Sequence, residues 1–311
     1  MKILHFAITA LFLTAPAAFA QQEGPVPTQS IITVDTKNPP RLTTQNITVK
    51  VNRRATPVSD LAPVTPNGTQ VALLIDDGLR TSVGRQLSDL KSFIQALPAG
   101  VEILVGYMQN GRVVPAQPFT TDHQAAAANL RLPMGSPGQS ASPYFCLSDF
   151  VKNWPGGSES DASSPMARKA RFVIMVTNGV DPYNGSVSPL NQNSPYVDNA
   201  ISDAQRAGVP VYSIYNSDAG IRGGAASFSG QSYLTQVADG TGGRAYYLGT
   251  GSPVSFAPFL DQFRNAIAES YIVTFNAAGR RPVELAVSTA LPKTKVRAPK
   301  AVQPGTRLGP A

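Results

Sequence analysis

The sequence is poor in the residues that build disulfide-linked or metal-bound frameworks. Its 311 residues include one cysteine, Cys146, and two histidines, His5 and His123. A single cysteine excludes an intrachain disulfide, and we expect Cys146 to serve as a small buried apolar residue. Zinc sites made of cysteine and histidine are excluded for the same reason.

Long hydrophobic runs are also missing, apart from one at the N-terminus. Residues 3–19 are apolar, follow Lys2, and lead into the small-residue ending Ala18-Phe19-Ala20. The run is shorter than the roughly 20 residues of a membrane span, and Pro16 interrupts it. We therefore interpret residues 1–20 as a secretory signal peptide, which predicts an exported protein, periplasmic or secreted, that does not span a membrane.

Positive charge is scarce in most of the chain and concentrated at its end. Residues 71–279 carry 13 basic and 15 acidic residues, a net of −2, whereas residues 280–311 carry 7 basic and 1 acidic, a net of +6. This basic end has no aromatic residue to stack on bases, so we expect no nucleic-acid binding. Binding of acidic polymers or anionic surfaces by this end is one alternative function.

The pattern after residue 67 is typical of an α/β domain. Apolar strands alternate with amphipathic helical segments, which predicts a mostly parallel sheet covered by helices on both faces. Asn110-Gly111 favours a tight hairpin turn and predicts one antiparallel strand at the sheet edge. The strands are expected at residues 71–76, 101–107, 112–116, 171–176, 209–215, 244–248 and 271–275, and the helices within 83–97, 121–130, 144–154, 195–207, 232–238 and 253–269.

The segments before and after this domain are expected to form structure of their own beside it. After the signal peptide we expect an extended or β segment at 21–66, then the α/β domain at 67–276. Strands within 277–300 have little to pair with except the N-terminal segment, so we predict a small β-layer made from both segments. Residues 301–311 are expected to form a disordered tail.

Polar side chains follow two strands that we expect to be neighbours. Asp76 and Asp77 come directly after residues 71–75, while Asn178 and Asp181 follow the strand at 171–176. The carboxyl ends of adjacent parallel strands converge on one crevice, where ligands usually bind. If Ile75 and Val176 lie side by side, these polar residues therefore share an edge with the Gly/Ser-rich loop around Ser142.

Several short motifs carry a resemblance to a known family. The strand at 71–76, the Asn-Gly hairpin, VIMVTNG at 173–179, GVPVYSI at 208–214 and TGGRA at 241–245 resemble the von Willebrand factor A domain. The match is closest to the secreted bacterial proteins called VWFA-related, and it covers about residues 45–298. The resemblance implies a Rossmann-like sandwich that holds a metal-ion-dependent adhesion site at the carboxyl edge of its sheet.

The family's metal site fits this chain poorly. Its first loop reads Asp-x-Ser-x-Ser, a second loop supplies a threonine, and a Thr-Asp-Gly turn supplies another aspartate. By resemblance, Asp76 is the first aspartate and Ser142 stands for the threonine, but Gly78 and Arg80 replace the two serines and Asn178 replaces the second aspartate. Magnesium requires near-octahedral oxygen coordination, so we predict a degenerate site without tight metal binding. These residues leave room for weak magnesium or manganese binding, which we do not expect, and imply no cofactor.

Two interpretations of Arg80 stay open. In the first, Arg80 forms an ion pair with Asp76 or Asp77, and the crevice has no function. In the second, Arg80 binds a carboxylate of a partner, helped by the N-terminus of the adjoining helix. We predict a non-enzymatic protein-interaction or adhesion module whose partner-binding candidates are Asp76, Asp77, Arg80, Ser142, Asn178 and Asp181. The partner itself is not identified by the sequence.

An exported hydrolase is the competing class of function. Such an enzyme needs a nucleophile with a positioned base, but the chain has no Gly-x-Ser-x-Gly elbow. The mature chain has only His123 as a histidine base, at the predicted start of a helix. A mechanism that uses only the carboxylates of Asp76 and Asp77 stays open.

Overall fold

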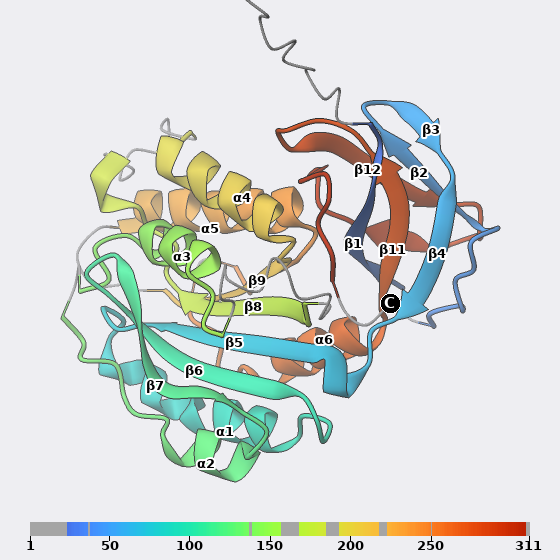
Figure 1. The fold of residues 1–311 in the computed structure, drawn as a ribbon. Coiled ribbons are helices and arrows are strands. Elements are labelled where there is room, and N and C mark those ends of the chain that lie inside the picture. Colours follow the sequence, from blue (N-terminus) through green and yellow to red (C-terminus); the bar gives the residue numbers. More distant parts are fainter. Residues whose placement is uncertain are drawn as a thin grey trace, which may run out of the picture.

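A six-stranded sheet forms the centre of an α/β unit, with a β-layer beside it (Figure 1). The computed structural model describes residues 24–36, 38–136, 139–156, 168–184, 193–217, 223–249 and 251–308, so the predicted signal peptide lies outside the described residues. The strand order is β10-β9-β8-β5-β6-β7. These strands are β5 (Thr69–Asp76), β6 (Glu102–Gln109), β7 (Arg112–Thr120), β8 (Ala170–Thr177), β9 (Val211–Tyr215) and β10 (Ala245–Tyr246).

All neighbouring strands of this sheet are parallel except the edge pair β6 and β7. The predicted hairpin turn joins that pair, with Asn110 and Gly111 both at positive φ (46° and 77°), as a type I′ turn requires. Ile75 of β5 lies opposite Val176 of β8, which confirms the adjacency on which the predicted crevice depends.

Helices of the described chain cover both faces of the sheet (Figure 1). Helices α1 (Leu87–Gln95), α2 (His123–Ala128) and α6 (Ala257–Ala268) pack on one face, and α3 (Pro143–Lys152), α4 (Pro195–Ala207) and α5 (Gly223–Thr241) pack on the other. The segment before α1, which we expected to be α-helical from residue 83, is the 3₁₀ helix η2 (Thr81–Gln86). Tighter turns of this kind are frequent at the start of α-helices.

The β-layer consists of two four-stranded sheets, ordered β13-β1-β11-β4 and β14-β12-β2-β3. The strands are β1 (Val26–Asp35), β2 (Ile47–Val51), β3 (Arg54–Thr56), β4 (Val58–Pro63), β11 (Ser270–Ala277), β12 (Val283–Thr289), β13 (Lys295–Arg297) and β14 (Ala301–Val302). A short 3₁₀ turn, η1 (Pro66–Gly68), connects β4 to β5. Segments from both ends of the chain therefore pair with one another.

The expected boundary of the α/β domain at residue 276 is wrong. Strand β11 pairs with β1 and β4 and belongs to the β-layer, not to the six-stranded sheet. Its alternating pattern buries Val273 and Phe275, together with Ile32 of β1, in the core of the β-layer. An alternating pattern predicts a half-buried strand but does not tell which sheet the strand joins.

The tail was expected to be disordered from residue 301, and this is wrong up to residue 308. Strand β14 pairs with β12, the Gln29 amide donates to the Thr306 carbonyl (2.8 Å), and Leu308 is buried in the core of the α/β unit. Burial of Leu308 compensates the conformational entropy lost by this segment. The basic residues from Arg280 to Lys300 therefore lie on or between strands, and Arg307 follows β14. Residues 309–311 lie outside the described part of the chain.

Within the described residues, the helices are too short or too polar to cross a bilayer.

Candidate functional site at the carboxyl edge of the sheet

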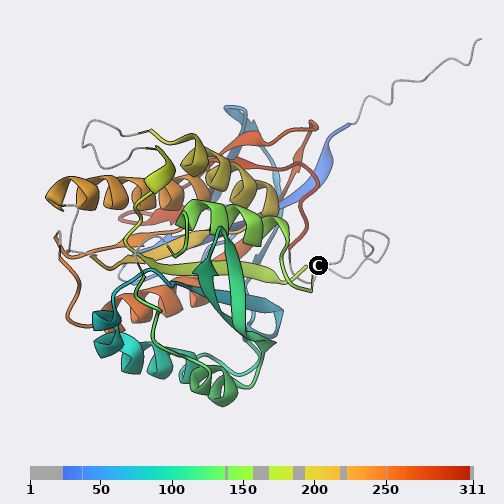
Figure 2. The ribbon, with the colours of Figure 1, turned by 90° about the vertical axis from the view of Figure 1, so that its left-hand side faces the viewer.

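The loops that follow the parallel strands gather at one edge of the six-stranded sheet, on the left of Figure 2. Strand β5 ends in Asp76, and β8 ends in Thr177. The Thr177 hydroxyl donates to Asp76 Oδ2 (2.8 Å), and the Gly78 amide donates to Asp76 Oδ1 (2.9 Å). Both carboxylate oxygens of Asp76 thus accept hydrogen bonds from within the chain. Thr177, which our sequence interpretation missed, is adjacent to the predicted Asn178.

Asp77 is held by a cation that the sequence analysis did not single out. Arg131 donates through both terminal nitrogens to the two oxygens of the buried Asp77 carboxylate (2.7 and 2.8 Å). The Gln109 amide group and the Met134 backbone amide donate to the same carboxylate. Burial alone would raise the pKa of Asp77, but the hydrogen bonds from Arg131, Met134 and Gln109 outweigh it and lower the pKa. Asp77 is therefore ionised and fully engaged near neutral pH.

Arg131 is itself fixed from two sides. Its guanidinium lies over the Tyr107 ring, 3.7 Å from the centroid, and its backbone amide and carbonyl both bind the Tyr107 hydroxyl. The hydrogen bonds to Asp77 raise the pKa of Arg131, although burial opposes them. No local sequence pattern could reveal this pair, because Arg131 follows Asp77 by 54 residues and lies in the loop after α2.

Ser142 and Asp181 are buried and organise helix starts. Ser142 is the N-cap of α3, and its hydroxyl accepts a hydrogen bond from the Tyr144 amide (3.3 Å). Asp181 accepts hydrogen bonds from the Tyr183 amide (3.2 Å) and from the hydroxyl of Ser194, the N-cap of α4 (2.8 Å). These side chains satisfy backbone donors at helix N-termini. Both side chains are buried, so they are not exposed for contact with a partner.

Arg80 and Asn178 are the two predicted site residues that reach the surface. Arg80 is exposed and precedes η2, and Asn178 is partly buried. The Asn178 side-chain oxygen accepts the Val180 amide (2.9 Å), which closes a local turn. The helix N-terminus that was expected to assist Arg80 belongs to a six-residue 3₁₀ helix, so its dipole is small.

Tyr144 ties the second loop to the end of β8. Its hydroxyl donates to the Gly179 carbonyl (2.6 Å) and is fully buried. Burial, followed by the nearby charges of Asp181 and Asp76, raises the pKa of Tyr144, which therefore stays a neutral hydrogen-bond donor. Hydrogen bonds thus connect the end of β5 to the end of β8, and the start of α3 to the loop that follows β8.

The oxygen atoms that the resemblance assigns to a cation site accept hydrogen bonds within the chain. Ser142 Oγ and Asn178 Oδ1 each accept a backbone amide, and Asp76 accepts two donors. The described residues contain no group of three or more histidine, cysteine, aspartate or glutamate side chains arranged to hold a metal. At the position of one missing serine, a Cβ on Gly78 would lie 3.2 Å from both Asp76 Oδ1 and the Ser136 carbonyl, which is a tight fit.

Neither His123 nor Cys146 is placed as a catalytic base or nucleophile at this edge of the sheet. The His123 ring binds the Val101 carbonyl (2.8 Å), just before β6 begins, at the amino edge of the sheet. A strand of eight residues separates that edge from the crevice by roughly 25 Å. Cys146 is buried, and burial followed by the charge of Asp76 raises the pKa of its thiol, so it is a poor nucleophile.

Comparison with known proteins finds similarity only to solved structures. No family model and no curated protein matches the chain. Among solved structures, those similar to it are mostly von Willebrand factor A domains. The fold is similar to the von Willebrand factor A domain.

The similarity is distant. A von Willebrand factor type A protein from Catenulispora acidiphila is 11% identical, with a TM-score of 0.42 over 91% of this chain and 75% of that chain. The manganese-loaded TRAP protein of Plasmodium vivax is 14% identical, with a TM-score of 0.41 over 77% of this chain and 96% of that chain. The ArnB paralog VWA2 from Sulfolobus acidocaldarius is 10% identical, with a TM-score of 0.37 over 89% and 76% of the two chains. We therefore infer function from the residues of this chain.

Proposed function

We propose that this chain is a non-enzymatic protein-interaction or adhesion module outside the cytoplasm, and that it binds a partner protein through apolar side chains at the carboxyl edge of its sheet. Seven of the nine large hydrophobic residues that are exposed in the described part of the chain lie on loops or a helix start at this edge. We call them the rim residues: Leu132, Met134, Tyr183, Phe228, Tyr247, Leu248 and Val254.

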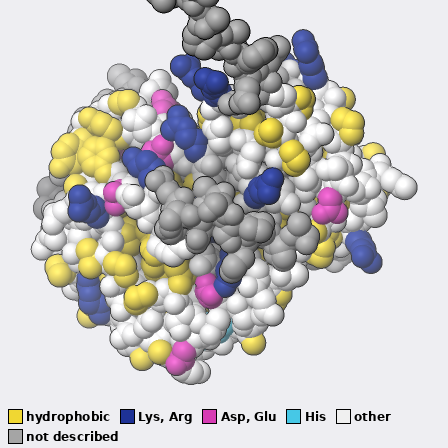
Figure 3. All heavy atoms as spheres, viewed as in Figure 1, with side chains coloured by type: hydrophobic (Ala, Val, Ile, Leu, Met, Phe, Trp, Pro, Cys, Tyr) yellow, Lys and Arg dark blue, Asp and Glu magenta, His cyan; other side chains and the backbone are white. Residues whose placement is uncertain are grey.

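The exposure of the rim residues is large. Met134, Tyr183 and Phe228 are each 59% exposed, Leu248 is 65% exposed and Val254 is 94% exposed. Scattered single hydrophobic residues are normal on a surface, but a concentration along one edge indicates an interaction site. A cluster of hydrophobic side chains is also visible at the upper left of the α/β unit in Figure 3.

The observation that carries the proposal is that buried polar side chains hold the backbone beneath exposed apolar ones. Asp77 accepts the amide of Met134, and Asp181 accepts the amide of Tyr183. Buried Gln86 donates to the carbonyls of Pro253 and Val254 (3.0 and 3.2 Å). A surface ordered before binding loses less conformational entropy when a partner docks. The buried acids predicted as contacts would thus act as supports for the contacting residues.

Arg80 and Asn178 would add polar contacts beside this apolar rim. The exposed Arg80 guanidinium can bind a carboxylate of the partner through two parallel hydrogen bonds. In this proposal the cation site is degraded, and the partner is recognised by apolar burial together with this fixed positive charge. Export is part of the proposal and rests on the apolar segment at residues 3–19.

The proposal is tested by photo-crosslinking in intact cells of the source organism. A photoreactive amino acid is placed singly at Met134, Val254 and, as a control, Val114, which is exposed on the edge strand β7. We expect one discrete adduct from both rim positions and none of that mass from Val114. The adduct from Val254 should disappear when Met134→Ser is introduced, with an unchanged melting temperature. The same adduct from all three positions, or one that survives Met134→Ser, would refute the rim as the binding surface.

A further inference from the structure

A second candidate site lies where the α/β unit meets the β-layer. A partly open cavity of about 300 Å³ is lined by the end of β1, the start of β9, β10, β13 and one side of α6. This volume is at the lower end of the range of small-ligand cavities. Its lining is mainly polar and includes Asp35, Arg244, Tyr246, Glu269 and Arg297. The cavity adjoins the first residues of β9, and the rim residue Tyr247 directly follows Tyr246 of its lining.

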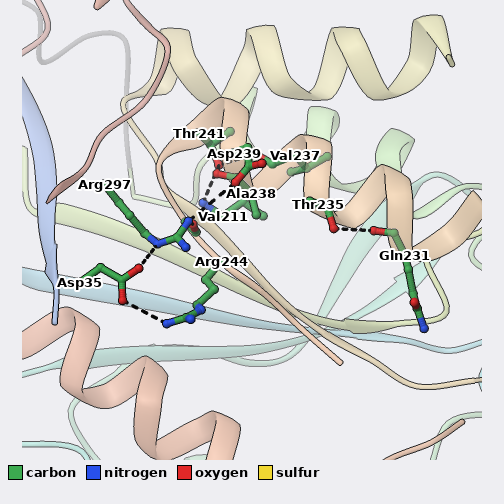
Figure 4. A network of polar contacts seen from close by, with 11 residues as sticks. Asp35, Val211, Gln231, Thr235, Val237, Ala238, Asp239, Thr241, Arg244 and Arg297 are labelled. Atoms are coloured by element: carbon green, nitrogen blue, oxygen red, sulfur yellow. Dashed lines mark hydrogen bonds and ion pairs between the residues drawn. The ribbon is translucent and has the colours of Figure 1, made fainter. Parts of the chain in front are cut away.

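The charges of this cavity are only partly paired. Asp35 accepts Nε of Arg297 (2.7 Å) and Nη1 of Arg244 (3.1 Å), as Figure 4 shows. Arg297 also donates to the Gly243 carbonyl (3.2 Å). Arg244 uses only Nη1, so that within the described chain its Nε and Nη2 atoms have no hydrogen-bond partner. That free side of the guanidinium can bind a carboxylate through two hydrogen bonds.

Two further groups that line the cavity lack partners. The Tyr246 hydroxyl and the Glu269 carboxylate form no hydrogen bond or ion pair with any described residue, although Tyr246 is only 4% exposed. Burial raises the pKa of both groups, and the charge of Asp35 raises that of Glu269 further. Glu269 is partly exposed, and the Tyr246 hydroxyl is not a buried atom that lacks a partner, so both groups can form hydrogen bonds with a molecule that enters the cavity.

We propose that this cavity binds a free α-amino acid by its ammonium and carboxylate groups. The ammonium group donates to Glu269, and the carboxylate accepts hydrogen bonds from Arg244 and from the Tyr246 hydroxyl. The two acids and two arginines of the lining carry a net charge of zero, so a ligand with one charge of each sign preserves the balance. A simple anion would face Glu269 without a counter-charge, and a simple cation would face Arg244.

The rest of the lining suggests which amino acids bind best. Gln262 and Asn265 of α6, together with the hydroxyl-bearing Thr36, offer uncharged donors and acceptors. A polar, uncharged side chain can therefore form hydrogen bonds in the cavity. This site would be independent of the rim, so failure of one proposal leaves the other intact.

The test uses the mature full-length chain and the common L-α-amino acids. Each is screened at millimolar concentration by thermal shift, and the amino acid with the largest effect is titrated by calorimetry. Its methyl ester, which lacks the carboxylate, and its N-acetyl derivative, which lacks the ammonium group, are titrated in parallel. We expect each derivative to bind about tenfold more weakly or worse, because it loses hydrogen bonds to a charged group. Absence of binding by every amino acid, or binding of both derivatives as tight as that of the unmodified amino acid, would overturn the proposal.

Variants locate the binding. Glu269→Gln and Tyr246→Phe preserve shape and should each weaken binding of the same amino acid by about tenfold. Asp261→Asn is the matched control, because Asp261 lies on α6, the helix that Glu269 caps, pairs with Arg264 and does not line the cavity. It should bind as the parent protein does. If Asp261→Asn weakens binding as much as Glu269→Gln, or if Tyr246→Phe and Glu269→Gln bind normally, the cavity is not the site.

Discussion

At the scale of single residues, the carboxyl edge is built around buried carboxylates. The strand pattern predicted that Asp76 and Asn178 share an edge, because both follow apolar strands whose parallel pairing could be inferred. Arg131 could not be predicted, because its contact with Asp77 depends on how the loop after α2 folds back. Sequence reasoning therefore located the acids but missed the cation that neutralises one of them.

The pair of Arg131 and Asp77 leads to the first prediction. Arg131→Ala leaves the buried Asp77 carboxylate without a counter-charge, and we expect it to lower the free energy of unfolding by about 2–3 kcal/mol. Urea denaturation at neutral pH measures this loss. The control is Arg264→Ala, which removes a pair on the exposed side of α6 and should change stability by less than about 0.5 kcal/mol. Equal losses in the two variants would contradict the role of Arg131.

The pH dependence of this loss has a definite sign. The pKa of Asp77 is lowered in the folded protein from its ordinary value of 3.8, so its contribution to stability is present above that value. The contribution disappears as the pH falls through the lowered pKa of the folded state. The difference in stability between the parent and Arg131→Ala should therefore shrink below about pH 4. A constant difference down to acidic pH would show that Arg131 acts by packing on Tyr107 and not by charge.

The proposed loss of the cation site gives a second prediction at this scale. Calorimetric titration of the mature chain with manganese should show no binding tighter than millimolar, because Gly78, Arg80 and Asn178 replace three oxygen ligands. Micromolar affinity would refute the degraded site. The triple variant Gly78→Ser, Arg80→Ser, Asn178→Asp should recover part of the affinity, provided that the tight space at Gly78 accepts a Cβ. If the triple variant recovers no affinity for manganese, Ser142 or the backbone around Gly78 is not positioned for a metal.

At the scale of elements, predictions from local signals were confirmed. The predicted Asn-Gly turn depends only on neighbouring residues and joins β6 to β7. The sheet to which β11 belongs, and the order of residues 301–308, depend on contacts with β1 and β12 far along the chain. Such contacts leave no local pattern, and these were the elements that sequence reasoning misplaced.

The contact between α5 and the loop after β8 yields a prediction about elements. A Cβ on Gly230 would lie 2.1 Å from the Asn178 carbonyl oxygen, so the helix and the loop touch through their backbones. Gly230→Ala must push the two apart, and we expect a loss of about 1–3 kcal/mol in unfolding free energy. Gly251→Ala is the control, since no atom lies within 4 Å of the added methyl group. Hydrogen exchange should speed up at residues 178–184 in the first variant alone, and unchanged exchange there would disprove the close contact.

At the scale of the whole molecule, the α/β unit and the β-layer share one core. Ile31 of β1, Ile272 of β11 and Leu308 belong to the same buried cluster as β5 and α6. Asp35 of β1 also binds Arg244 of the loop before β10. Because apolar contacts and an ion pair both join the two parts, we expect them to unfold together in one transition.

Leu308→Ala tests this shared core. Leu308 is fully buried, so its truncation should lower the free energy of unfolding by about 2–5 kcal/mol. Fluorescence of Trp154, which is buried in the α/β unit, follows unfolding of that unit, and hydrogen exchange in β1 and β11 follows unfolding of the β-layer. If the two parts unfold together, Leu308→Ala shifts both midpoints by the same amount. Leu132→Ala, at an exposed rim position, should leave both midpoints unchanged. A shift confined to β1 and β11 would mean that the β-layer opens independently, in which case the amino-acid cavity between the two parts could open without loosening the rim.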